Sequence, residues 1–363
     1  MIILGSTKRH AAWTAPLLFL WLMLSQVVTA SLNTTTTVDP EDGNYTITTT
    51  IITTTITTTC SADGECETRH DTISTTSERM SLTPPTVELF NVTYDVATTV
   101  ELDRGSEGLT GTIPTTIGWL TALTRLSLFG NELTGGVPTE LGLLTNLQEL
   151  SFSRNSLTGT LPSEVGCLSA MTNIGIRDNR LSGLIPSQVA SMVALMELNL
   201  YNNNLNGPIP SELGLLTAFT RLSLWDNSLT GNMPTELGLS TTLQFVGLYG
   251  NALIGSIPSE IGLMTDLTTL GLGPNFLRGE IPSELGLLSK LTALGLHENN
   301  LSGSIPDELG LLTVLGSMSL NDNQLVGSVP IDLCANPDLA WIRVDCAPDP
   351  FPIQCPCNEC QCV

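Results

Sequence analysis

Side chains that could transfer protons are scarce in this sequence. It has three histidines in 363 residues, His10, His70 and His297, and histidine is the side chain that most often acts as an acid or base near neutral pH. His297 precedes Glu298 but has no nucleophile at a motif spacing, so we interpret the pair as plain concave surface. No phosphate-binding glycine loop, nucleophile elbow or metalloprotease spacing occurs. The sequence predicts a protein that is not an enzyme and needs no cofactor.

Aromatic residues recur at a fixed spacing in the middle of the chain. Tyr201, Trp225 and Tyr249 lie 24 residues apart. Aromatic side chains with a polar group are favoured at binding surfaces because they bury a large area at little entropic cost. The predicted ligand-binding residues are Glu197, Tyr201, Arg221, Trp225, Asp226, Phe245 and Tyr249. The alternative is that aromatic pairs across neighbouring strands only stabilise a solvent-facing sheet.

Cysteines gather near the end of the chain. The group consists of Cys334, Cys346, Cys355, Cys357, Cys360 and Cys362. An even number in an exported chain predicts up to three disulfides, whose connectivity the spacing leaves open. The alternative is a zinc or copper site, because C-x-C-x-x-C-x-C is dense enough to hold a metal. We favour disulfides and expect no metal. Cys60 and Cys66 are expected to close a small loop, and Cys167 is left over.

Acidic residues dominate the charge of the chain. The 35 Asp and Glu against 13 Lys and Arg give a net charge of −22, which disfavours nucleic acid as a partner. A column of glutamates also recurs every 24 residues, interrupted once by Gln188: Glu140, Glu164, Glu212, Glu236, Glu260, Glu284 and Glu308. Each follows a proline near the amino end of a predicted helical turn, where a carboxylate is stabilised. The alternative is that the stacked carboxylates attract calcium or a basic partner.

A 24-residue repeat supplies the elements that must position these side chains. Asparagine recurs nine times from Asn131 to Asn323, and leucine, two residues later, recurs ten times from Leu109 to Leu325. Glycine recurs ten times at positions 111 to 327, and proline ten times at positions 114 to 330. A period of this length indicates a stack of supersecondary units that bury their leucines against one another.

Each column of the repeat has a physical role in such a stack. The alternation at Leu222-Ser-Leu224 predicts a short strand with its leucines inward and Ser223 and Trp225 outward. Adjacent strands lie about 4.8 Å apart, so Tyr201, Trp225 and Tyr249 should form a contiguous ridge beside a shallow trough of serine and glycine residues. Asn227 then leaves the strand, and its amide needs donors and acceptors from neighbouring turns. Gly231 permits a tight bend, and Pro234 fixes φ before a short helical turn.

The pattern L-x-x-L-x-L-x-x-N-x-L-x-G-x-I-P-x-x-L-G-x-L-x-x resembles the plant-specific class of leucine-rich repeats, seen in plant receptor ectodomains and polygalacturonase-inhibiting proteins. The resemblance covers about residues 99–345. It implies an α/β solenoid: a right-handed horseshoe with a parallel sheet on its concave face and about ten repeats, here followed by a disulfide-rich cap. The usual Cys-Trp opening cap is absent, and Arg104 and Glu107 replace leucine and asparagine in the first turn. The Thr-rich leader and Cys-rich tail resemble secreted diatom repeat proteins.

One column departs from the related repeats, which usually carry polar residues there. It consists of Leu215, Leu239, Leu263, Leu287 and Leu311. We expect these leucines to be packed by their own neighbours. The alternative is an exposed apolar strip suited to self-association.

The chain divides into four parts by composition. Residues 1–30 read as a signal peptide, with an uncleaved signal anchor as the alternative. Residues 31–98 form a Thr-rich low-complexity stalk, residues 99–333 the solenoid, and residues 334–363 a closing strand and Cys-rich cap. Glycosylation sequons lie at Asn33, Asn44, Asn91 and Asn300. We therefore expect a secreted or cell-surface protein, attached to a membrane only if the leader is uncleaved.

Together these features predict a non-catalytic recognition protein that binds an extracellular protein, peptide or glycan on its concave face. One alternative is a structural wall or matrix component bridged by cations along its acidic column. A second, which the resemblance suggests, is an inhibitor of a wall-degrading enzyme.

Overall fold

A computed structural model describes residues 29–38, 45–60, 66–79, 86–346, 353–358 and 360–362. The chain divides into two compact units, with the boundary between residues 84 and 85, and each is described by itself. The predicted leader lies almost entirely outside the described residues, as does the Asn44 sequon. No helix in the described ranges has the length and apolarity to cross a membrane.

The first unit contains three antiparallel strands, β1 (Thr29–Val38), β2 (Tyr45–Cys60) and β3 (Cys66–Arg79). The backbone register pairs Cys60 with Cys66 at the end of the β2–β3 hairpin, where a closing disulfide was expected. The sequence analysis interpreted this segment as a stalk because of its low complexity alone. Threonine and isoleucine are β-branched, however, and such residues favour extended strands. The Thr-rich segment therefore has regular strand pairing that the sequence analysis did not predict.

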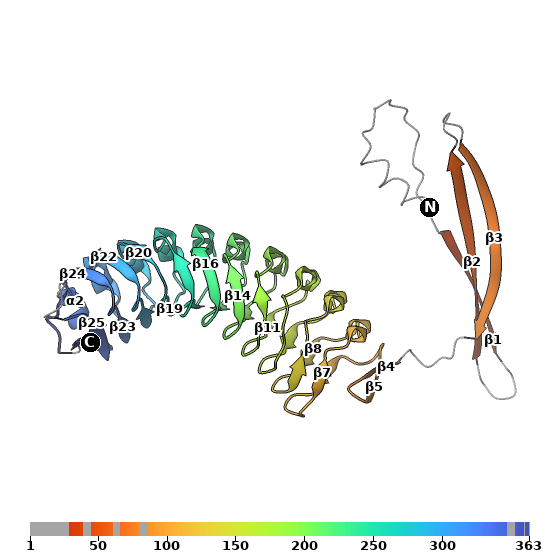
Figure 1. Ribbon diagram of the computed structural model, residues 1–363, viewed down its shortest axis with the longest axis horizontal. Helices are drawn as coiled ribbons and strands as arrows, with labels where there is room; N and C mark the ends of the chain where they lie inside the picture. Colours follow the sequence, from red (N-terminus) through yellow and green to blue (C-terminus); the bar gives the residue numbers. More distant parts are fainter. Residues whose placement is uncertain are drawn as a thin grey trace. The chain divides into compact units, whose positions relative to one another are not determined.

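The second unit is a solenoid whose turns follow an arc (Figure 1). Its inner face is a 12-stranded parallel sheet in which consecutive turns pair without a change of register, as Arg221 with Phe245 and Phe245 with Thr269. The strands are β6 (Glu101–Asp103), β8 (Arg125–Ser127), β10 (Glu149–Ser151), β11 (Asn173–Gly175), β13 (Glu197–Asn199), β15 (Arg221–Ser223), β17 (Phe245–Gly247), β19 (Thr269–Gly271), β21 (Ala293–Gly295), β23 (Ser317–Ser319), β25 (Trp341–Val344) and β27 (Cys360–Cys362).

The outer face consists of short 3₁₀ turns, each preceded by the repeat proline in extended conformation. They are η1 (Thr115–Trp119), η2 (Thr139–Leu143), η3 (Ser163–Cys167), η4 (Ser187–Ser191), η5 (Ser211–Leu215), η6 (Thr235–Leu239), η7 (Ser259–Leu263), η8 (Ser283–Leu287) and η9 (Asp307–Leu311), and one α-helical turn, α2 (Ile331–Cys334), follows. A Cβ atom on Gly142 would lie 2.5 Å from the backbone oxygen of Glu164. A glycine at this position, present in every 3₁₀ turn except η4, where Ala190 replaces it, therefore lets the next turn pack closely.

Short strands connect the two faces along one side of the solenoid. They are β7 (Thr110–Thr112), β9 (Glu132–Thr134), β12 (Ser182–Gly183), β14 (Asn204–Gly207), β16 (Ser228–Asn232), β18 (Ala252–Ile254), β20 (Arg278–Gly279), β22 (Asn300–Ser304), β24 (Gln324–Ser328) and β26 (Ile353–Gln354). The apolar columns of the repeat lie between these faces in one continuous core. The predicted horseshoe solenoid is confirmed.

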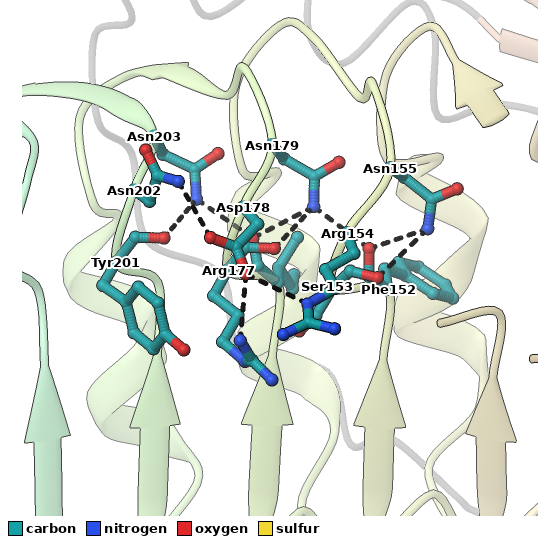
Figure 2. Close-up of polar contacts among 11 residues, drawn as sticks. Phe152, Ser153, Arg154, Asn155, Arg177, Asp178, Asn179, Tyr201, Asn202 and Asn203 are labelled. Carbon is teal, nitrogen blue, oxygen red and sulfur yellow. Dashed lines mark hydrogen bonds and ion pairs between the residues drawn. The ribbon is translucent and has the colours of Figure 1, made fainter. Parts of the chain in front are cut away.

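A ladder of asparagine amides joins consecutive turns (Figure 2). Asn179 Nδ2 donates to Ile176 O in its own turn and to Phe152 O in the preceding turn, and its Oδ1 accepts from Leu157 N. The same three contacts recur at Asn203, where Oδ1 accepts from Leu181 N. Each amide therefore satisfies backbone groups of two turns, as the repeat predicted.

The two ends of the ladder use other residues. At the start, Asn131 Oδ1 accepts from the backbone of Glu107, and the Glu107 carboxylate pairs with Arg104. At the end, the buried Asp345 carboxylate accepts from the backbone N–H groups of Asp322 and Asn323. The irregular first turn thus replaces amide contacts with an ion pair, and a carboxylate ends the ladder.

A hairpin covers the opening end of the core. Strands β4 (Thr86–Leu89) and β5 (Val92–Asp95) pair antiparallel, and Val87 and Leu89 are buried in the common core. The solenoid unit therefore includes residues 85–98, which the sequence analysis had placed in the stalk. The sequon residue Asn91 is exposed at the tip of this hairpin.

Three disulfides close the other end. They join Cys334 to Cys357, Cys346 to Cys362, and Cys355 to Cys360. Strand β27 adds to the sheet beside β25 and protects its edge. Cys167 is exposed without a disulfide partner among the described cysteines. The expected disulfide-rich cap is confirmed, with this connectivity.

The leucine column on the outer face is exposed, which corrects the expectation that its neighbours pack it. Leu215, Leu239, Leu263, Leu287 and Leu311 are between 50% and 64% exposed. Each occupies the last position of its 3₁₀ turn, and the residue that follows it is buried instead: Leu216, Ser240, Met264, Leu288 and Leu312. We call these five residues the leucine strip.

Replacing one ladder asparagine should destabilise the solenoid. Asn275→Leu removes the acceptor of Leu253 N and the donor to Leu248 O and Leu272 O. Buried groups left without partners cost about 1–3 kcal/mol each, so we expect the free energy of unfolding in urea to fall by about 2–4 kcal/mol. The exposed Asn206→Ala is the control and should change it by less than about 0.5 kcal/mol. Equal effects at both positions would show that the ladder carries no special stability.

Candidate ligand-binding face

Three residues of every turn face outward on the concave sheet. In the sixth strand these are Arg221 and Ser223 within β15 and Trp225 just beyond it, while Leu222 and Leu224 are buried between them. Ser223 is nevertheless fully buried, and Ser127, Gly247 and Ser319 of the same central column are buried too. The central column therefore does not form the continuous open trough that the sequence suggested.

The predicted aromatic residues form one stack across three turns. The rings of Tyr201 and Trp225 are nearly parallel, 14° apart, with centroids 3.9 Å apart. Trp225 and Tyr249 are 13° apart with centroids at 5.2 Å. The contiguous ridge expected from the 24-residue spacing is confirmed as the aromatic stack Tyr201–Trp225–Tyr249. Because these rings stack face to face, their edges form most of the outer surface.

An arginine lies over the first ring of the stack. The Arg177 guanidinium is 5.2 Å from the centroid of Tyr201 and is held by Asp178 at 2.9 Å (Figure 2). Asp178 also lies 3.7 Å from Arg154 and accepts a hydrogen bond from Asn202 Nδ2. This network fixes the guanidinium plane against the tyrosine.

Glycines beneath the rings make the stack possible. A Cβ atom on Gly247 would lie 2.8 Å from Trp225 Cε3 and 2.9 Å from Phe245 Cε1, and one on Gly271 would lie 3.2 Å from Tyr249 Cδ1. The Trp225 and Tyr249 rings thus lean over the glycine of the following strand, whereas Tyr201 has Ser223 at the equivalent position. The sequence analysis recorded these glycines as part of an open trough and missed this role. The offset of 22 residues from aromatic to glycine was the available signal.

The other predicted binding residues lie around the stack. Phe245 meets Trp225 edge to face at 5.9 Å, and Arg221 lies 4.6 Å above the Phe245 ring. Glu197 accepts a weak hydrogen bond from Asn199 Nδ2, and the exposed Asp226 has a left-handed backbone. The structure therefore gathers the aromatic residues and Arg221 and leaves the two carboxylates at the margins.

Burial raises the pKa of the Tyr249 phenol above its ordinary value, and the negative charge of Asp226 and the nearby Tyr201 raise it further. The phenol is consequently neutral around pH 7. The end ring of the stack thus presents an uncharged aromatic face and a hydrogen-bonding hydroxyl.

Two hollows lie on either side of the stack. The N-terminal hollow, of about 600 Å³, is lined by Asp103, Arg125 and Glu149 and extends to Asn199. Arg125 lies 3.9 Å from Asp103 and 3.5 Å from Glu149, so its charge is shared by two exposed ion pairs. Of the seven predicted ligand-binding residues, none lines this hollow. Asp103, Arg125 and Glu149 carried no aromatic signal, which is why the sequence analysis did not select them.

The C-terminal hollow, of about 420 Å³, begins at Tyr249 and ends at Trp341 and Arg343. Its lining includes Gly271, Gly273, Gly295, His297, Glu298 and Asn321. Tyr249 is the only one of the seven predicted residues in it. His297 and Glu298, interpreted as plain concave surface, therefore line a hollow of that face.

In the described residues, the carboxylates of the acidic column are not gathered into a cluster that could hold a cation. Within the described ranges, three Asp, Glu, His or Cys ligand atoms come together only at Cys355, Cys357 and Cys360, and these cysteines are joined in disulfides. Carboxylates such as Glu140 and Glu236 instead accept hydrogen bonds from the hydroxyl groups of the preceding threonines. The calcium alternative therefore has no support in the geometry.

Filling the space beneath Trp225 should disturb the stack. Gly247→Ala places a methyl group against two rings, and we expect loss of the near-ultraviolet circular dichroism of the stacked rings and about 1–3 kcal/mol of stability. Gly295→Ala is the matched control, since its Cβ would be 3.8 Å from the nearest atom, an ordinary contact. An unchanged spectrum in Gly247→Ala would contradict the stacked arrangement.

Comparisons with known proteins agree with this geometry. The Leucine Rich Repeat family model matches residues 146–168, 194–216 and 290–312. The solved ectodomain of the Arabidopsis thaliana receptor kinase GASSHO1/SCHENGEN3, in complex with CASPARIAN STRIP INTEGRITY FACTOR 2, is 39% identical with a TM-score of 0.67. That match covers 68% of this chain and 30% of the ectodomain. No functionally curated protein matches the sequence.

Two further structures are similar. The Arabidopsis HAESA ectodomain, in complex with an N-terminally extended IDA peptide hormone, is 32% identical with a TM-score of 0.63 over 68% of this chain and 40% of that one. A plant ice-binding protein is 28% identical with a TM-score of 0.56, over 70% of this chain and 82% of that one. The chain thus spans less than half the length of the two receptor ectodomains.

The horseshoe fold, the ladder asparagines and these matches agree with the repeat class expected from the sequence. The chain is a leucine-rich-repeat protein with repeats of the type found in plant receptor ectodomains.

Proposed function

We propose that the chain is a non-catalytic extracellular recognition protein whose concave face binds an extended protein or peptide across the aromatic stack. The similar receptor ectodomains are solved with peptide ligands, which supports a binding role. The disulfide-closed cap supports an oxidising, extracellular location, because such bonds persist outside the cytosol. Glycans remain within the proposal as alternative ligands.

The aromatic stack is the observation that carries the proposal. Trp225 contacts Tyr201, Phe245 and Tyr249 and is therefore held rigidly in the free protein. A rigid aromatic surface loses little conformational entropy when a ligand covers it. The hollows on both sides give a ligand room to continue along the sheet. The face is thus organised for a ligand longer than one turn.

Trp225→Ala should abolish ligand capture without unfolding the chain. Central aromatic residues of an interface contribute about 2 kcal/mol or more, so we expect at least about thirtyfold weaker binding. The measurement is a pull-down from the extracellular medium with the wild type, followed by titration of the captured molecule. Trp119→Ala on the outer face, where Trp119 is exposed, is the control. If both variants capture the ligand equally well, the proposal is contradicted. A captured wall-degrading enzyme that loses activity would specify an inhibitor.

The leucine strip favours a second function, a structural wall or matrix component that self-assembles through its outer face. Five exposed leucines in successive turns leave a continuous apolar surface in water. This function is independent of Trp225 and does not require calcium.

Substituting the strip tests this second function. Leu239→Ser combined with Leu263→Ser should convert a concentration-dependent oligomer to a monomer in light scattering. Ile254→Ser, which changes an exposed apolar residue outside the strip, should leave the oligomer intact. A wild-type chain that stays monomeric at all concentrations would exclude the second function.

A further inference from the structure

Arginines cover aromatic rings repeatedly on the concave face. The four pairs are Arg154 with Phe129, Arg177 with Tyr201, Arg221 with Phe245, and Arg343 with Trp341, at 4.6 to 5.4 Å from guanidinium carbon to ring centroid. Guanidinium groups stack well on aromatic faces because they are planar and weakly hydrated. In the described part of the chain, the aromatic stack has such a cover at Tyr201 and has none at its other end, Tyr249.

The sequence leaves space at that end. The next residue in the same column is Gly273, which has no side chain to continue the stack, and the central column supplies Gly271 and Gly295. These glycines line the C-terminal hollow together with Tyr249 and His297. The imidazole leans back over Gly273, since a Cβ atom there would lie 2.3 Å from His297 Cε1. The imidazole thus fills the place that a side chain at position 273 would take, and the open part of the hollow lies over Gly295, where a Cβ atom would have no neighbour closer than 3.8 Å.

The charge beside this space favours a cation. Glu298 lines the same hollow, is exposed, and has no ion-pair partner among the described residues. Arg343, the hollow's cation, lies at the far wall, stacked on Trp341 and donating from Nε to Gln361 Oε1 at 3.2 Å. Asp226, which lies close enough to raise the Tyr249 pKa, adds negative charge near the ring. Apart from Arg343, the charged residues in and beside the hollow are therefore acidic.

We propose that the C-terminal hollow binds an arginine side chain of the peptide or protein ligand, with its guanidinium stacked on the free face of Tyr249 and paired with the Glu298 carboxylate. The bound group would repeat at Tyr249 the contact that Arg177 makes at Tyr201. Arginine fits better than lysine because its planar fork both stacks and donates two parallel hydrogen bonds to one carboxylate. This inference rests on the proposed function and specifies the partner as a ligand with an accessible arginine.

Short defined peptides test the inference on the intact chain. The probe is acetyl-Gly-Gly-Arg-Gly-Gly-amide, and three matched peptides carry citrulline, lysine or phenylalanine instead of arginine. Binding is followed by nuclear magnetic resonance of labelled tyrosine and histidine rings. We expect the arginine peptide to shift the Tyr249 and His297 signals and to bind about tenfold more tightly than the citrulline peptide, which is planar but uncharged. The affinity for the lysine peptide should lie between the affinities for the arginine and citrulline peptides.

Variants of the chain test the contact with the Tyr249 ring and the contact with the Glu298 carboxylate separately. Glu298→Gln should reduce the affinity for the arginine peptide to that for citrulline, and Tyr249→Ala should remove binding. Asp322→Asn changes an exposed carboxylate at the equivalent position of the next turn and should have no effect. Tighter binding of the phenylalanine peptide, equal binding of citrulline, or no shift at Tyr249 would overturn the inference. If the arginine peptide does not bind while capture of the extracellular ligand still depends on Trp225, the proposed function stands and the arginine site alone is rejected.

Discussion

The hydrogen bonds between asparagine amides and the backbone of neighbouring turns are the constraint on which the rest of the structure depends. Each amide contacts its own turn and the one before it, so it fixes both the shape of a turn and its distance from the next. Because neighbouring strands lie about 4.8 Å apart, equivalent side chains on the surface of the sheet recur at the same interval. The aromatic stack exists because Tyr201, Trp225 and Tyr249 are placed at that interval with no change of register.

The framework could be predicted from the sequence because every turn has the same pattern of residues and packs against equivalent neighbours. The positions of strands, bends and outer turns follow from leucine, glycine and proline columns, and nearest-neighbour packing determines them almost completely. The ends were harder to predict, because they lack a neighbour on one side. Glu107 and Asp345 close the ladder by different contacts, and the β4–β5 hairpin packs on the first turn although its sequence has no repeat signature. The disulfide connectivity likewise depends on how the last strand folds back.

The candidate site was predictable in position and less so in detail. The spacing of the aromatic residues correctly placed them side by side. It could not tell that the rings stack face to face and lean over Gly247 and Gly271, because that orientation results from the small residues of the next strand. The hollows arise in the same way from what the neighbouring side chains leave uncovered. The exposure of the leucine strip was missed because both leucines at the end of a turn, such as Leu215 and Leu216, look equally apolar in sequence while only one faces the core.

The uniform register of the turns also has a consequence for how such a protein can change over generations. Deleting or duplicating one whole 24-residue unit by unequal recombination would join two equivalent turns and leave every ladder contact with a partner. The fold would tolerate the event, whereas the recognition surface would not. Loss of the unit that carries Trp225 would bring Tyr201 next to Tyr249 and shorten the stack by one ring. Gene length and ligand preference can therefore evolve together here while the architecture is conserved.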